Sequence, residues 1–182
     1  MKRNLFSFIL FLFVLQQANG QLYYTKNGSI SFFSKSPLQD IEADNNQVIS
    51  VLNIQSGQIE FSLLNNAFHF PKAKMEEDFN ENYIESDTYP RSSFKGTLIN
   101  INKVDFTKDG NYPVMVKGDL TIHGITKNIT ANGAIIISKA TISAYSSFTV
   151  FVKDYDIKIP TIVSNKISEK IQIKINCSYQ KK

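Results

Sequence analysis

The chain of 182 residues has one cysteine, no tryptophan and only two histidines, His69 and His123. A single cysteine, Cys177, excludes an internal disulfide, so the stability of the fold must come from its sheet and core. The histidines lie far apart in the sequence, and no spacing typical of a zinc site surrounds them. A nucleophile elbow is also missing. These absences predict a protein with no catalytic residue, no metal and no cofactor.

The sequence also has no strongly basic or strongly acidic block. The chain carries 20 basic and 16 acidic residues, and the small basic excess is spread along the sequence. A nucleic-acid interface needs lysines and arginines gathered on one face, so no nucleic-acid partner is expected. A charge this close to balance also argues against electrostatic recruitment to a membrane.

The only long apolar run is at the N-terminus. Two basic residues precede the run Leu5–Leu15, and Ala18 and Gly20 are small residues suited to a cleavage site. The run is too short to span a bilayer and has the layout of a secretory signal. We expect residues 1–20 to be a signal peptide that is removed, and residues 21–182 to form a single domain. The Asn-, Lys- and Ile-rich composition indicates a bacterium, with the mature protein periplasmic or secreted.

The rest of the sequence reads mainly as short strands separated by turns that carry Gly, Asn, Asp or Pro. The last one alternates most regularly: apolar Ile171, Ile173, Ile175 and Cys177 share one face, which predicts that Cys177 is a buried core residue. One dry and one wet face are typical of antiparallel sheets. The segment 36–47 is predicted to be a turn. The expected strands are Ser29–Ser34, Val48–Gln55, Gln58–Asn65, Ser93–Val104, Pro113–Ile122, Asn128–Ser138, Thr141–Val152 and Glu169–Tyr179.

One segment departs from this pattern. After Pro71, the residues Met75, Phe79 and Tyr83 recur at the spacing of a helix face. The intervening residues are mostly acidic, and a solvated helix face explains them better than acid–base chemistry or a calcium loop. We therefore expect one short amphipathic helix that covers one end or edge of the sheet.

Eight short antiparallel strands can form a sandwich or a closed barrel, and a barrel of that size can hold one elongated ligand. Aromatic and branched side chains on inward positions suit an apolar pocket, although they fit a filled core equally well. If the barrel is hollow, strand parity and aromatic content place seven residues on its wall and three helix residues at its entrance. The expected lining residues are Phe32, Phe61, Phe68, Phe70, Phe94, Ile122 and Phe148, with Met75, Phe79 and Tyr83 as the cap.

Several stretches together resemble the YceI-like family. The most specific is "YPRSSFKGTL" followed by "VKGDLTIHGITKNIT", covering Tyr89–Leu98 and Val116–Thr130. "AFHFPKAKMEEDFNENYIESDTYP" resembles the helical segment before it, and "FTVFVKDYDIKIPTIVSNKISEKIQIKI" the closing pair of strands. The resemblance implies an all-β, antiparallel, roughly eight-stranded lipocalin-like barrel with one short helix. It also implies binding of a polyisoprenoid or another long-chain lipid.

His123 is the one residue of that motif that could carry chemistry. It precedes Gly124 between two alternating strands, where a glycine supplies the positive φ of a tight reversal. As a base it would need a partner, and Asp119 is four residues back, which is about 13 Å along a strand. We interpret His123 as a turn residue and His69 as a solvent-side residue between Phe68 and Phe70.

The leading hypothesis is a non-catalytic, exported protein that encloses an apolar long-chain lipid. A barrel with a filled core that mediates protein contacts, an enzyme that uses His123, and an outer-membrane barrel remain alternatives. Lys117, Lys170 and Lys174 argue against the last, because each would be costly in lipid at mid-strand. No transmembrane segment is expected in the mature chain, and a homodimer is left open.

Overall fold

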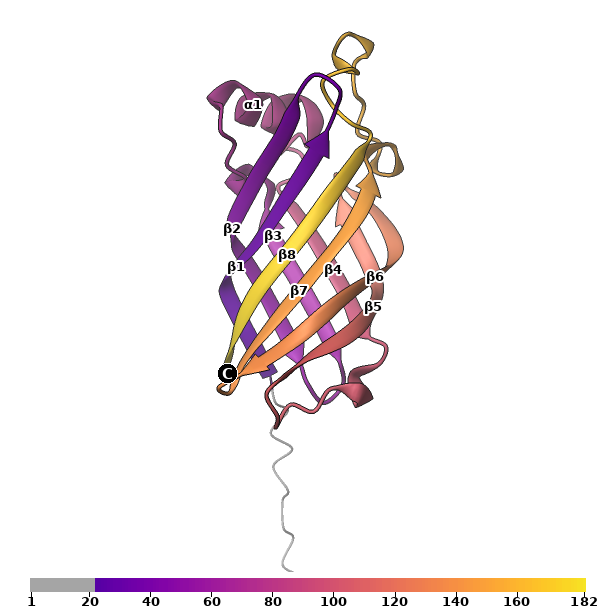
Figure 1. The fold of residues 1–182 in the computed structure, drawn as a ribbon. Coiled ribbons are helices and arrows are strands. Elements are labelled where there is room, and N and C mark those ends of the chain that lie inside the picture. Colours follow the sequence, from indigo (N-terminus) through magenta and orange to yellow (C-terminus); the bar gives the residue numbers. More distant parts are fainter. Residues whose placement is uncertain (1–21) are drawn as a thin grey trace, which may run out of the picture.

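The computed structural model describes residues 22–182, and the predicted signal peptide lies outside them. Eight antiparallel strands form one closed barrel in the order in which they occur in the chain, which confirms the expected fold (Figure 1). The strands are β1 (Leu22–Lys35), β2 (Asp40–Asn53), β3 (Gln58–Leu64), β4 (Arg91–Leu98), β5 (Gly110–Ile122), β6 (Ile125–Ser138), β7 (Thr141–Phe151) and β8 (Lys170–Lys181).

The first and last strands close the barrel. Phe32 of β1 pairs with Ile173 of β8, and the amide of Lys182 donates to the carbonyl of Leu22 at 2.9 Å. Closure leaves neither strand with an unpaired edge, and an open edge is where sheets aggregate. The outward positions of β5 and β8 carry exposed Lys117, Lys170 and Lys174, as their alternation predicts.

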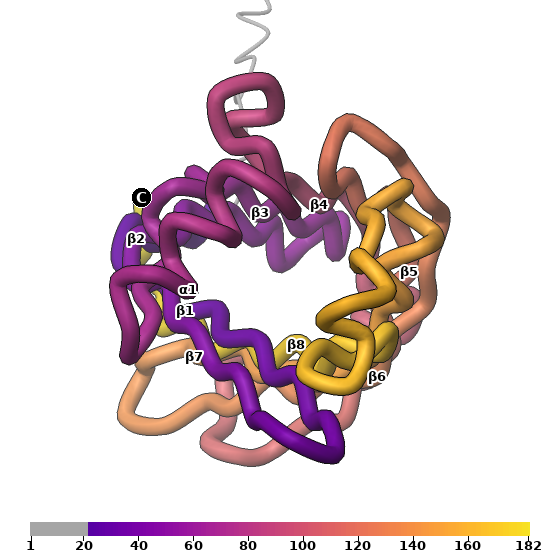
Figure 2. Tube along the Cα trace, turned by 90° about the horizontal axis from the view of Figure 1, so that it is seen from above, coloured from indigo at the N-terminus to yellow at the C-terminus, as the bar shows by residue number. Residues whose placement is uncertain are grey.

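Because successive strands run up and down, the connections alternate between the two ends of the barrel. One end, called the mouth below, carries the turn 36–39, the segment 65–90, the turn 123–124 and the connection 152–169. Seen along the barrel axis, the strands form a ring, with α1 (Ala73–Asp78) and the β7–β8 connection on opposite sides of the mouth (Figure 2). Within residues 22–182, no helix is long and apolar enough to cross a membrane.

The predicted helix is present, and it changes character midway. α1 continues directly into η2 (Phe79–Tyr83), a π-helical turn in which the amide of Ile84 donates to the carbonyl of Phe79 at 2.8 Å. Short 3₁₀ turns complete the connections: η1 (Asn65–Ala67), η3 (Ile101–Lys103), η4 (Val152–Tyr155) and η5 (Thr161–Val163).

Several strand predictions were wrong at their ends. The first strand, expected over Ser29–Ser34, extends over Leu22–Lys35. The segment 36–47 was expected to be a turn, but most of it belongs to β2, in which Ala43 and Asn45 are buried. The side-chain amide of Asn45 donates to the carbonyl of Leu64 at 2.9 Å, so a polar residue occupies a core position and hides the alternation. The strand expected to reach Val104 ends at Leu98, where η3 follows.

The core fills the end of the barrel opposite the mouth. Leu52, Ile135 and Ile142 are almost completely buried there, and Cys177 is 0% exposed, which confirms it as a core residue. Burial raises the pKa of the Cys177 thiol to about 12, so the thiol stays protonated and non-nucleophilic at neutral pH. A smaller cluster that includes Ile30, Val48, Leu63 and Phe68 lies toward the mouth.

Candidate ligand cavity

The barrel is hollow at its mouth. A cavity of about 490 Å³ extends inward from this end, within the range of small-molecule sites. Its walls come mainly from β1, β5, β7 and β8, from the segment 65–90 with α1 and η2, and from the connection 152–169, while β2, β3 and β4 each contribute one residue. Most of the lining side chains are apolar, so the cavity suits a hydrocarbon chain.

Most of the residues expected on the wall lie on this cavity. Phe32, Phe68, Phe70, Ile122 and Phe148 line it. The remaining two, Phe61 and Phe94, do not reach it. They lie deeper and line a separate void of about 70 Å³, which Phe148 also borders.

Aromatic rings form the wall beneath the helix. The ring centroid of Phe32 lies 5.2 Å from that of Phe68, 5.6 Å from that of Phe70 and 5.4 Å from that of Phe79. Phe70 and Phe79 are themselves 5.1 Å apart. Tilted and edge-on pairs at these separations attract one another beyond the area that they bury. The cluster therefore joins β1, the chain after η1 and the helix into one wall.

The three expected cap residues all line the cavity. Met75 lies in α1, and Phe79 and Tyr83 lie in η2. Residues spaced by four lie on one face of a helix, so the continuous α1–η2 segment presents all three to the cavity. Burial, and then the charge of Asp78, raise the pKa of the Tyr83 phenol, which therefore stays neutral at the entrance.

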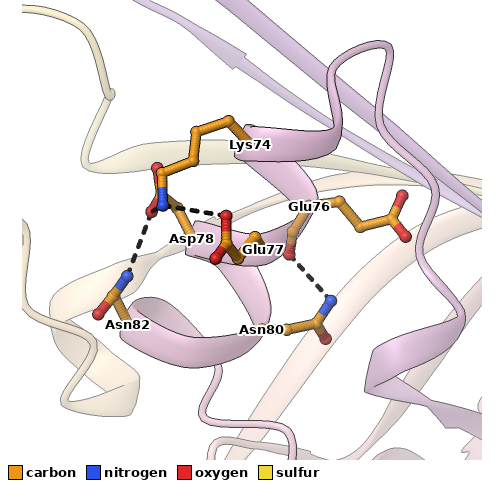
Figure 3. A network of polar contacts seen from close by, with 6 residues as sticks. All are labelled: Lys74, Glu76, Glu77, Asp78, Asn80 and Asn82. Atoms are coloured by element: carbon orange, nitrogen blue, oxygen red, sulfur yellow. Dashed lines mark hydrogen bonds and ion pairs between the residues drawn. The ribbon is translucent and has the colours of Figure 1, made fainter.

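The acidic residues of the helix form contacts with its own polar face (Figure 3). Lys74 Nζ lies 3.1 Å from Glu77 and 3.0 Å from Asp78, and Asn80 donates to the backbone carbonyl of Glu76 at 2.9 Å. The Glu76 carboxylate accepts from the amide of Phe70 at 3.1 Å, which ties the helix to the preceding segment. These contacts fit the interpretation of the carboxylates as a solvated helix face.

We did not predict from the sequence that the side of the mouth opposite the helix contributes to the cavity wall. The connection 152–169 places apolar side chains over the cavity, between residues that are polar or turn-forming. A long connection with only two short 3₁₀ turns is more often functional than incidental, and its density of isoleucines was the available signal. The lining residues from this segment are Val152, Tyr155, Ile157, Ile159, Val163, Lys166 and Ile167.

Polar atoms in the wall are already engaged within the protein. Asn65, which is 0% exposed, donates to the carbonyl of Tyr89 at 2.6 Å and accepts from the Ser92 hydroxyl at 2.8 Å. The Ser34 hydroxyl accepts from the amide of Ser168 at 3.0 Å. Because these polar groups already have hydrogen-bond partners within the protein, an apolar ligand can fill the cavity without leaving any of them unsatisfied. The charged lining residues Lys72, Lys74, Asp78 and Lys166 come from the helix and the long connection at the mouth.

His123 occupies the turn that was expected. His123 and Gly124 have φ values of 49° and 72°, and they join Ile122 to Ile125 in a two-residue hairpin. Its side chain is 9% exposed, which the sequence did not predict. Nδ1 donates to the carbonyl of Tyr155 at 3.0 Å, and Nε2 lies 3.5 Å from the Glu85 carboxylate without a hydrogen-bond partner among the described residues. His123 thus connects the hairpin to both sides of the mouth.

We expect His123→Asn to lower the free energy of unfolding by about 1–2 kcal/mol, because the carbonyl of Tyr155 loses its donor. Asparagine tolerates the positive φ, so the substitution tests the ring rather than the backbone. Urea unfolding followed by circular dichroism measures the effect. His69→Asn is the matched control, because the His69 side chain is 68% exposed and lies 3.7 Å from Glu76. Equal unfolding midpoints for the two variants would contradict a structural role for His123.

The two histidines do not assemble a metal centre with other side chains. Over residues 22–182, no three His, Cys, Asp or Glu side chains gather in a group that could hold a metal ion. His69 forms an isolated bridge with Asp44 of β2 and points into solvent, as expected for a residue between Phe68 and Phe70.

Comparison with solved structures identifies several similar barrels. A polyisoprenoid binding domain from Saccharophagus degradans superimposes with a TM-score of 0.75 at 14% identity, covering 89% of this chain and 99% of that one. BcnA of Burkholderia cenocepacia gives a TM-score of 0.70 at 15% identity, covering 84% and 96%. The YCEI protein of Campylobacter jejuni gives 0.53 at 13% identity, covering 100% and 99%.

These identities show a shared fold and no more. No curated protein sequence matches the chain. The family comparison is stronger, because the YceI-like domain matches residues 19–179, nearly the whole chain. The same residues include the hairpin and the helical segment on which the resemblance was first based. The chain therefore belongs to the YceI-like domain family.

Proposed function

We propose that this protein binds one apolar, long-chain lipid, an isoprenoid or a similar molecule, in the cavity at its mouth and catalyses no reaction. The observation that carries the proposal is the cavity of about 490 Å³, with apolar walls and internally paired polar atoms. The polyisoprenoid binding domain among its structural neighbours supports the same class of ligand.

The energetics need no specific polar contact. Burying ~500 Å² of ligand hydrocarbon at ~25 cal/mol per Å² gives a gross ~12 kcal/mol before the costs of association. A useful affinity remains after several kcal/mol are lost to ordering the ligand. The contacts of His123 are those of a residue that positions loops.

Native mass spectrometry of protein purified from its native host, followed by organic extraction, tests the proposal. We expect a stoichiometric hydrophobic adduct that is lost on denaturation. A clean unliganded mass from several growth conditions, together with no binding of added lipids, would contradict it. That outcome would favour the alternative of a barrel that acts through protein contacts.

We further propose that the protein is exported, on the strength of the signal-like segment 1–20. The exposed lysines Lys117, Lys170 and Lys174 on the outer face suit a barrel surrounded by water. The mass of the mature chain should then correspond to a start at Gln21, in material released by osmotic shock. Retention of Met1 in the purified protein would exclude this processing.

A further inference from the structure

Two separate hollows lie along the axis of the barrel. The larger one, about 490 Å³, opens at the mouth, and the smaller one, about 70 Å³, lies beyond it. Leu120 and Phe148 line both, so their side chains form part of the partition. On β8, Ile173 faces the larger hollow and Ile175 the smaller, which places the partition between these two levels.

The strand register builds this partition. Phe61 of β3 pairs with Phe94 of β4, and Phe94 pairs with Leu120 of β5, so three large side chains lie in one row across neighbouring strands. The rings of Phe61 and Phe94 are 6.3 Å apart. On the other side of the barrel, Phe148 of β7 pairs with Ile173 of β8.

A glycine fixes the position of one of these rings. Gly96 follows Phe94 by two residues on the same face of β4, and a Cβ atom there would lie 2.5 Å from Phe94 Cζ. The Phe94 ring therefore occupies the space above Gly96. The missing side chain lets the ring lie against its own strand and point away from the mouth, because Gly96 is farther from the mouth than Phe94.

The volume of the larger cavity sets a length. A methylene group occupies about as much space as a water molecule, ~30 Å³ in the liquid, so the cavity holds roughly 16 carbon-sized groups. The smaller void has room for about two more. A chain much longer than this would have to leave its tail in solvent or displace the partition.

We infer that Leu120 and Phe148, which border both hollows, form a floor that is supported from below by Phe61 and Phe94 and that limits the bound lipid to a chain of about 16 to 20 carbons. This inference rests on the proposed function and narrows its ligand to sesquiterpenoid- to diterpenoid-sized or fatty-acyl-sized chains. Long polyprenyl chains would be bound over only part of their length. The partition is thus a determinant of specificity.

Displacement of the fluorescent apolar probe N-phenyl-1-naphthylamine by prenyl alcohols of increasing length tests the floor. Each newly buried methylene raises affinity about fourfold, so affinity should rise steeply from geraniol through farnesol to geranylgeraniol. Solanesol, which has more than twice as many carbons as the cavity allows, should bind no more tightly than geranylgeraniol.

Phe148→Ala should open the partition and merge the two hollows, because the Phe148 ring borders both. We expect the affinity for solanesol to rise at least tenfold relative to that for farnesol, and Phe94→Ala, which removes a ring beneath the floor, should produce a smaller shift in the same direction. Phe70→Ala is the matched control, because it removes a ring at the mouth and should weaken all prenyl alcohols alike. Circular dichroism verifies that each variant retains its strands.

The outcomes separate the two ideas. If no alcohol displaces the probe from the wild-type protein, the proposed function fails. If alcohols bind but affinity continues to rise to solanesol, or if Phe148→Ala and Phe94→Ala leave the length profile unchanged, the floor is wrong while lipid binding stands.

Discussion

Gly118→Ala is expected to lower the free energy of unfolding by about 3 kcal/mol, the largest effect of any single methyl group that we foresee in this barrel. Gly118 of β5 pairs with Gly96 of β4, where the two strands approach closely. A Cβ atom at position 118 would overlap the carbonyl oxygen of Lys95 and the Cα atom of Gly96. Since both are backbone atoms, no rotation of a side chain relieves the overlap, and the β4–β5 pairing must shift.

Urea unfolding of Gly118→Ala against Gly110→Ala measures this effect. Gly110 begins the same strand, but a Cβ atom there would meet only the ring of Tyr112, at 3.1 Å or more, and that ring can move. The control should stay within about 0.5 kcal/mol of the wild type. If both variants unfolded at the same urea concentration, the close approach of β4 and β5 would not be a constraint on the fold.

Phe32→Ala should have the second-largest effect, and it should affect both stability and binding. Phe32 contacts Phe68, Phe70 and Phe79, so its loss removes the centre of the aromatic wall and loosens the helix. Because the side chain is half-buried, we expect a cost of about 2–3 kcal/mol in unfolding free energy, toward the lower end for a phenylalanine. Lipid affinity should fall at least tenfold, since one wall of the cavity is missing.

Phe33→Ala provides the comparison for this experiment. Phe33 is the next residue of β1 and belongs to the outer face of the strand, opposite Phe32. Like Phe32, it is a half-buried phenylalanine in the same part of β1, but its side chain does not line the cavity. Probe displacement by farnesol should be unchanged in Phe33→Ala. A similar loss of affinity in both variants would show that the effect comes from β1 as a whole rather than from the cavity wall.

The sequence predicts which way a side chain points better than how deep it lies. Alternation placed Phe61 and Phe94 on the inner face correctly, but their depth depends on the register between strands, which no single strand records. The result is that both line the smaller void instead of the cavity at the mouth. Phe32, Phe148 and Ile122, predicted by the same reasoning, happen to lie at the right level.

Other features escaped prediction for different physical reasons. The predicted strand for β2 began too late because Asn45 fills a core position with a hydrogen-bonded amide, which a hydrophobic pattern cannot reveal. Ile157 and Ile159 were overlooked because they lie between the 3₁₀ turns η4 and η5, in a stretch without a helix or strand period that could be recognised. The helix, in contrast, was found because Met75, Phe79 and Tyr83 keep one spacing across α1 and the π turn.

The hydrogen bond between Lys182 and Leu22 indicates that the chain could be circularly permuted. The start of β1 and the end of β8 lie side by side at the end opposite the mouth, so a short linker could join them (Figure 1). New termini could then be opened in the β6–β7 turn at Lys139 and Ala140, which lies at the same end and is solvent-exposed. Such a circular permutant would keep every loop of the mouth in place, so the order of the strands along the chain is separable from the cavity that they enclose.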